Sequence, residues 1–118
     1  MSAVWVDRML VDVRGDGDAV VFIHGLGGSL NAWTPLLPAL PNHRCVRMDL
    51  PGAGRSHKAY ALGESTPHGG RLSVAVHADA VRRVCESQGI THAHVVGHSF
   101  GTVIAQHLAA ETPALVRS

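Results

Sequence analysis

The segment GHSFG, residues 97–101, constrains the fold of this chain more than any other feature. It has the pattern G-x-S-x-G and stands between an apolar run, HAHVV at residues 92–96, and a predicted helix. A serine on such a sharp strand-to-helix turn needs an unusual backbone conformation. Gly97 and Gly101 leave no Cβ where the strand and the helix approach most closely. The pattern therefore predicts an exposed Ser99 hydroxyl at the positively polarised amino end of a helix.

The rest of the chain alternates between strand and helix patterns. AVVFI, residues 19–23, is a short continuous apolar run, which is typical of a strand buried on both faces. Alternating strands and helices predict an α/β fold, with a mostly parallel sheet and helices on both faces. The predicted strands are residues 9–13, 19–23, 44–50 and 92–96. Three helices are predicted: one that begins after Asn31 as N-cap, one over residues 72–88 and one from Ser99 to about Glu111. An irregular connection is predicted over residues 55–70.

A glycine-rich loop, HGLGGS, follows the first buried strand. Acyl transfer needs two N–H donors aimed at the oxygen that becomes negative in the tetrahedral state. The N–H of Phe100, directly after Ser99, would supply one of them. We expect Leu26 N–H to supply the other, with Gly27 as the alternative. His24 at the start of the loop is expected to be a structural histidine that bonds to loop carbonyls.

Three segments together resemble the α/β-hydrolase superfamily: HGLGGSLNAW after one strand, DLPGAGRS after the next and GHSFGTVIAQHLA at the turn. The resemblance implies a single, incomplete hydrolase domain over residues 1–118, truncated after the nucleophile-elbow helix. It implies that Ser99 is the nucleophile, that Leu26 and Phe100 form the oxyanion hole, and that no cofactor is needed. The nearest groups are esterases, lactonases, carbon–carbon hydrolases and perhydrolases, whereas the dehalogenase and epoxide hydrolase branches use an aspartate nucleophile. We interpret DLPGAGRS as a structural turn beside the site.

The catalytic partners of the serine are the missing part of this pattern. A serine hydroxyl is a weak nucleophile until a histidine takes its proton and an acid orients that histidine. After Ser99 the chain contains only His107 and Glu111 as such groups. His107 lies about 12 Å along the helix at 1.5 Å per residue, too far to bond to the serine. We therefore expect the acid and the histidine beyond Ser118, the next strand to begin near residues 114–116, and no efficient activity from the chain alone.

Composition narrows the partners. The net charge is +1 and 46% of the residues are hydrophobic, so neither nucleic acid nor a membrane is indicated. The expected partner is a small-molecule acyl substrate. Because the strand before Ser99 would have an unpaired edge, we also expect a homo-oligomer or a complementing C-terminal half. Cys45 and Cys85 are expected to be free thiols, and the amino terminus lacks a leader pattern, which indicates a cytoplasmic protein.

Three other interpretations remain open at this point. Gly25-Leu26-Gly27 after a strand, with Asp49 in the next one, resembles a dinucleotide fingerprint, but Leu30 stands where its third glycine belongs. A non-catalytic member would keep the fold for binding or interaction. A metal site is not expected, because no cysteine or carboxylate completes a ligand set among the clustered histidines. Those histidines are His92, His94 and His98.

Overall fold

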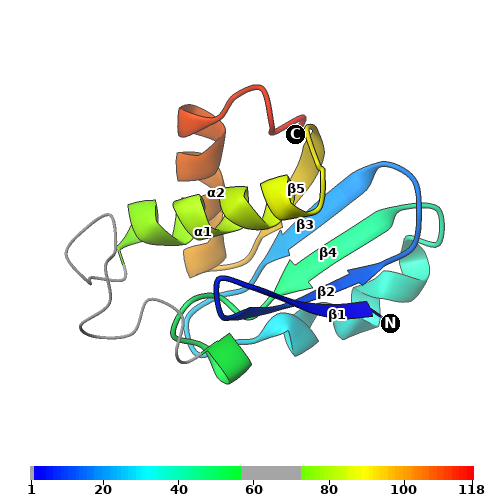
Figure 1. Ribbon diagram of the computed structural model, residues 1–118, viewed down its shortest axis with the longest axis horizontal. Helices are drawn as coiled ribbons and strands as arrows, with labels where there is room; N and C mark the ends of the chain where they lie inside the picture. The colour runs from blue at the N-terminus through cyan, green and yellow to red at the C-terminus, as the bar shows by residue number, and fades with distance from the viewer. Residues whose placement is uncertain (1, 57–72) are drawn as a thin grey trace.

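The computed structural model describes residues 2–56 and 73–118 (Figure 1). Five strands form one sheet in the order β1-β2-β4-β3-β5. β3 pairs in parallel with both β4 and β5, whereas β2 runs antiparallel to β1 and to β4. The predicted α/β class is confirmed, and the sheet is mixed. The strands are β1 Ser2–Val6, β2 Met9–Arg14, β3 Ala19–Ile23, β4 Arg44–Met48 and β5 Ala93–Gly97; the helices are α1 Val74–Ser87 and α2 Phe100–Glu111, with 3₁₀ segments η1 Leu30–Ala39 and η2 Gly54–Ser56.

The sequence pattern does not predict β1. This strand forms a hairpin with β2 in which Val6 pairs with Met9. Asp7 and Arg8 both have positive φ angles, 47° and 68°, as the two central residues of a type I′ turn do. Such turns usually contain asparagine or glycine, so the sequence gives little indication of the hairpin. Its antiparallel strands are the reason that the sheet is mixed.

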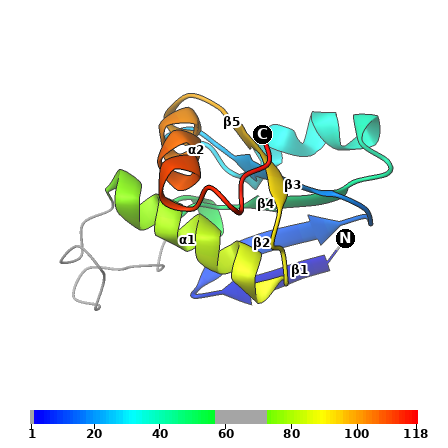
Figure 2. The same ribbon diagram turned by 90° about the horizontal axis from the view of Figure 1, so that it is seen from above.

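Different helices cover the two faces of the sheet (Figure 2). Val21 and Ile23 of β3 lie in the main core, together with buried residues of α1 and α2. The alternate residues Val20 and Phe22 lie in a second cluster with Trp33 of η1. This alternation is the period of two that a strand imposes on its side chains. β3 is therefore buried on both faces and helices lie on both sides of the sheet, as predicted.

The segment after β3 is a 3₁₀ helix rather than an α-helix. Its N-cap is Ser29, whose Oγ accepts a hydrogen bond from Asn31 N at 3.2 Å, so the prediction of Asn31 as N-cap is wrong. Pro35 and Pro38 lie inside η1 and have no N–H to donate. Each proline removes a hydrogen bond of a regular α-helix, and its ring clashes with the preceding turn, which disfavours an α-helix here.

α1 begins and ends with residues that favour helix termini. Oγ of Ser73 accepts from Val76 N at 3.2 Å and so caps the first turn. Gly89, with φ of 68°, follows the last turn as predicted. The irregular connection is predicted over residues 55–70, and its first two residues belong to the 3₁₀ segment η2. The rest of that connection and the predicted helix start at Leu72 lie outside the described residues. None of the helices in residues 2–56 and 73–118 is long and apolar enough to cross a bilayer.

The chain after α2 returns to the outer edge of β5. Ala93 N donates to Leu115 O and Val95 N donates to Ser118 O, both at 2.8 Å. An isolated parallel bridge joins Ala93 to Val116. The chain thus pairs with β5 through an isolated bridge near residues 114–116, where the sequence predicts the next strand. The edge of β5, expected to be unpaired, is therefore covered at Ala93 and Val95.

Candidate active site

Ser99 lies on the turn between β5 and α2, with φ of 55° and ψ of −121°. A non-glycine residue in this region is strained, so the surrounding structure must impose the conformation. A Cβ added to Gly97 would lie 2.5 Å from Gly101 O, and one added to Gly101 would lie 2.1 Å from Ile23 O. The two glycines therefore let β5, α2 and β3 approach one another, as the sequence pattern predicts.

The Ser99 side chain is exposed and does not cap the helix that it precedes. A serine present only as an N-cap would accept a hydrogen bond from an N–H of the first helical turn. Ser99 makes no such bond, although Thr102 N donates to its backbone oxygen at 2.9 Å. The hydroxyl is therefore free of any partner among the described residues, at the end of α2 where unpaired N–H groups gather.

The loop after β3 lies directly against this serine. A Cβ added to Gly25 would be 3.0 Å from Ser99 Cβ and 3.5 Å from its Oγ. The loop is closed by a hydrogen bond of 3.1 Å from Gly28 N to Gly25 O. Leu26 and Phe100 line the same cavity of about 380 Å³. Leu26 and Phe100, the residues whose N–H groups are the predicted donors, thus line one cavity from two separate segments.

His24 holds two of the loops of the site together. The ring is buried, and its Nε2 accepts a hydrogen bond of 3.0 Å from Leu50 N. Its Nδ1 lies 2.6 Å from Gly25 O, and a carbonyl oxygen can only accept, so Nδ1 carries the proton. Both ring nitrogens are used by backbone groups. His24 therefore makes the bonds expected of a structural histidine.

Asp49 ties the same region to the start of η1. Its Oδ1 accepts from Leu30 N at 2.8 Å and its Oδ2 accepts from Arg55 N at 2.9 Å. Because both oxygens are occupied and the carboxylate is buried, Asp49 cannot bind a ribose hydroxyl. The loop also leads into a 3₁₀ segment and not into the α-helix of a dinucleotide site. These contacts contradict the dinucleotide interpretation and agree with a structural role for DLPGAGRS.

His77 is a site residue that the sequence pattern does not reveal. It lies in the first turn of α1, is 5% exposed and lines the same cavity as Phe100. The two rings meet edge to face, with centroids 5.4 Å apart and planes at 87°. The only sequence indication is its position one helical turn after Ser73. No local pattern relates it to Phe100, because the contact joins two different helices.

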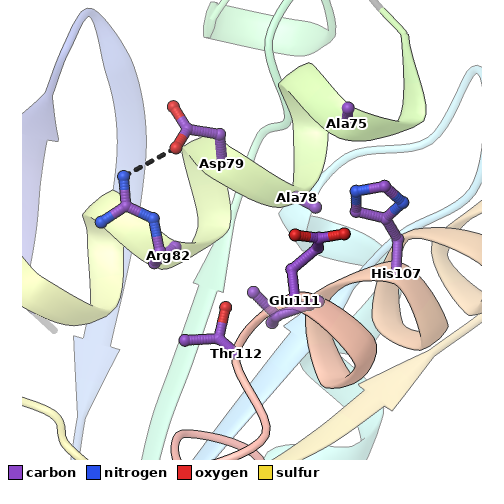
Figure 3. Close-up of a pocket in the computed structure, with 8 residues that line it drawn as sticks. Ala75, Ala78, Asp79, Arg82, His107, Glu111 and Thr112 are labelled. Atoms are coloured by element: carbon purple, nitrogen blue, oxygen red, sulfur yellow. Dashed lines mark hydrogen bonds and ion pairs between the residues drawn. The ribbon is translucent and has the colours of Figure 1, made fainter.

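His107 and Glu111 lie away from Ser99, as predicted. Figure 3 shows both side chains projecting from α2 into a second cavity, of about 340 Å³, which lies between α2 and α1. Across this cavity, Asp79 accepts a hydrogen bond of 2.7 Å from Arg82. The described residues therefore bring neither a histidine nor an acid to the Ser99 hydroxyl.

The three histidines around β5 have separate surroundings. Nδ1 of His92 lies 3.0 Å from Ala114 O, and Nδ1 of His94 lies 2.8 Å from Ser118 Oγ. The His98 ring meets Trp33 edge to face at 6.5 Å. Within residues 2–56 and 73–118, no three histidine, cysteine or acidic side chains gather as metal ligands would.

A strained serine that follows a parallel strand, beside the glycine loop of the neighbouring strand, places this chain among α/β proteins with a hydrolase-type nucleophile turn. The family model described as alpha/beta hydrolase fold matches residues 18–118. The chain therefore belongs to the alpha/beta hydrolase family, and its relatives are mostly hydrolytic enzymes.

Similar proteins differ in the reactions that their names describe. The chain is 38% identical over 105 residues to the dihydrolipoyllysine-residue acetyltransferase component of the acetoin cleaving system of Cupriavidus necator, covering 88% of this chain and 26% of that protein. It is 32% identical over 108 residues to RutD of Azorhizobium caulinodans, which carries the provisional name of a carbamate hydrolase, covering 91% of this chain and 37% of RutD. An epoxide hydrolase structure from an endophytic Streptomyces matches with a TM-score of 0.82 and 26% identity, covering 98% of this chain and 34% of that one. The chain thus spans well under half the length of each of these proteins.

Proposed function

We propose that this chain carries the nucleophile of a serine hydrolase that cleaves a carboxylic ester, a lactone or a related acyl compound. The observation that supports this most strongly is the backbone of Ser99, which is strained at φ 55° while its exposed hydroxyl caps no helix. Strain of this kind is kept where it serves a site. A serine nucleophile favours acyl transfer over the aspartate chemistry of dehalogenases and epoxide hydrolases.

In this mechanism Oγ of Ser99 attacks the acyl carbon while a histidine takes the hydroxyl proton. The carbonyl oxygen becomes negative and accepts hydrogen bonds from the backbone N–H groups of Phe100 and Leu26, with Gly27 as the alternative donor. The leaving group departs with the proton, and water then releases the acid from the acyl-enzyme. No step needs a cofactor. The acid and the histidine would come from sequence beyond Ser118 or from a second polypeptide.

The setting of the reaction is also part of the proposal. The thiols of Cys45 and Cys85 are free and buried, which supports a reducing, cytoplasmic location. Val96 of β5 and Val103 of α2 are partly exposed, 37% and 47%, near the carboxy-terminal end of the sheet. These side chains support pairing with a second copy or with a complementing C-terminal half.

A second candidate function is a binding or interaction protein that has kept the fold without the reaction. One specific observation favours it: no described residue activates the Ser99 hydroxyl. The two candidates differ in the chemical reactivity of this serine, which can be measured without knowing the natural substrate.

The test uses the protein expressed from its complete coding sequence and a fluorophosphonate probe, with the adduct located by peptide mass spectrometry. We expect the adduct on Ser99, its loss in Ser99→Ala and its retention in Ser87→Ala, a control at an exposed serine of α1. Residues 1–118 alone are expected to show no efficient turnover. Absence of a Ser99 adduct in the complete protein would contradict the hydrolase proposal and favour the binding protein.

A further inference from the structure

The cavity beside Ser99 is lined by a histidine that the proposed mechanism does not use. His77 is the buried histidine of α1, and it lines this cavity with Phe100 and the loop of residues 24–28. A polar side chain that is 5% exposed normally has all of its hydrogen-bonding atoms paired. Among the residues that the structure describes, one nitrogen of His77 has no such partner.

The hydrogen bonds of His77 define which nitrogen this is. Nδ1 lies 2.8 Å from the backbone oxygen of Ser73, which can only accept, so Nδ1 carries a proton. In the neutral ring the lone pair is then on Nε2. No group within residues 2–56 and 73–118 bonds to this atom. The cavity is therefore lined by a fixed imidazole whose free nitrogen can accept a hydrogen bond.

We propose that Nε2 of His77 accepts a hydrogen bond from a hydroxyl or N–H group on the acyl part of the substrate. This inference rests on the proposed function and narrows its substrate class to acyl compounds that have a hydrogen-bond donor on the acyl chain. The placement follows from Phe100, because its backbone N–H would bind the acyl oxygen while its ring contacts His77. An acyl chain that extends from Ser99 into the cavity would bring its donor to the imidazole.

Packing alone does not account for a histidine at this position. The edge-to-face contact with Phe100 needs only a ring, and phenylalanine would make it without burying two nitrogens. When a substrate displaces water from Nε2, a hydroxyl or N–H group on the substrate replaces the lost hydrogen bond, whereas a substrate without such a donor does not. The preference should therefore depend on the nitrogen and not on the ring.

The test compares two esters with the complete protein: p-nitrophenyl 3-hydroxybutyrate and p-nitrophenyl 3-methoxybutyrate, in which a methyl group replaces the donor hydrogen. We expect kcat/KM to favour the hydroxy ester by about tenfold to a hundredfold. The His77→Phe variant should show no preference for the hydroxy ester, and it should still hydrolyse the methoxy ester. His107→Phe, the same change in the cavity between α1 and α2, should keep the preference. An equal rate for both esters in the unmodified protein, or a preference that survives His77→Phe, would overturn the proposal.

A second measurement separates this inference from the proposed function. The ¹⁵N resonance of His77 Nε2 is followed while 3-hydroxybutyrate or 3-methoxybutyrate is added, which requires no turnover. A shift with the hydroxy acid alone supports the acceptor role even if Ser99 proves unreactive towards the fluorophosphonate. An unchanged resonance, or the same shift with both acids, overturns the role of His77 even if Ser99 is labelled.

Discussion

Removal of the buried carboxylate of Asp12 is expected to destabilise the fold by about 3 kcal/mol, at the lower end of the range for breaking a buried ion pair. Asp12 of β2 is fully buried, and its Oδ2 accepts from Nε of Arg47 on β4 at 2.8 Å. Arg47 is itself only 2% exposed. In Asp12→Ala the guanidinium of Arg47 would remain buried without a counter-charge, and an unpaired buried charge destabilises the folded state.

The contacts of the pair set the expected magnitude. Nη1 of Arg47 also donates to Leu30 O at 3.1 Å and to Thr34 Oγ1 at 2.7 Å, so the side chain remains fixed beneath η1 when the carboxylate is lost. The second ion pair of Asp12, with Arg14 at 3.0 Å, is partly exposed and should contribute at most about 1 kcal/mol. Oδ1 of Asp12 has no partner among the described residues, and its removal offsets part of the loss.

Urea unfolding followed by the fluorescence of Trp33, a buried residue of η1, measures this change. The midpoint should fall while the slope m remains unchanged. The double variant Asp12→Ala/Arg47→Met should recover most of the stability, because neither charge remains buried. Arg14→Ala is the control and should cost no more than about 1 kcal/mol. The reasoning is refuted if Asp12→Ala costs less than this control, or if the double variant is no more stable than the single one.

Three further changes test other contacts. Gly25→Ala would place a Cβ 3.0 Å from that of Ser99. We expect the free energy of unfolding, measured by thermal unfolding, to fall by about 1–3 kcal/mol, and fluorophosphonate labelling to be slower. An unchanged labelling rate would contradict this. Gly101→Ala would place a Cβ 2.1 Å from Ile23 O, so we expect the variant to lose the dispersed amide resonances of the folded protein. A native-like spectrum would contradict this expectation. Burial raises the pKa of Cys85 from 9.0 to about 11, so the folded state keeps a proton that the unfolded chain loses between these values. Stability should therefore be complete below pH 9 and fall as the pH rises towards 11, and Cys85→Ala should reduce that fall in urea unfolding; equal slopes would count against it.

Features of the fold that depend on local sterics could be predicted from the sequence. Gly97 and Gly101 were expected at a close approach of strand and helix, and each would place a Cβ within 2.5 Å of a backbone oxygen. The continuous apolar run of β3 correctly indicated burial on both faces. In each case a few neighbouring residues contain the whole physical reason, because steric exclusion and side-chain alternation act over one turn or one strand.

Features that depend on distant contacts could not be predicted in the same way. β1 is held by pairing with β2 across a turn of Asp7 and Arg8, which lack the residues that usually mark such turns. η1 keeps its position through the buried side chain of Arg47, whose role as a donor to Leu30 O has no counterpart in the local pattern. The partners of a buried charge depend on the tertiary structure, so composition and periodicity cannot predict them.

The two buried histidines of the site show why residue type alone does not define function. In His24 and in His77 a backbone carbonyl fixes the proton on Nδ1 and leaves the lone pair on Nε2. In His24 that lone pair accepts a hydrogen bond from Leu50 N, so the ring holds two loops together and has no acceptor left for a ligand. In His77 no donor among the described residues bonds to Nε2, so the same ring in the same tautomer can accept a hydrogen bond from a ligand. The difference lies in one backbone N–H, that of Leu50 shortly after β4, which bonds to the ring of His24 and not to that of His77.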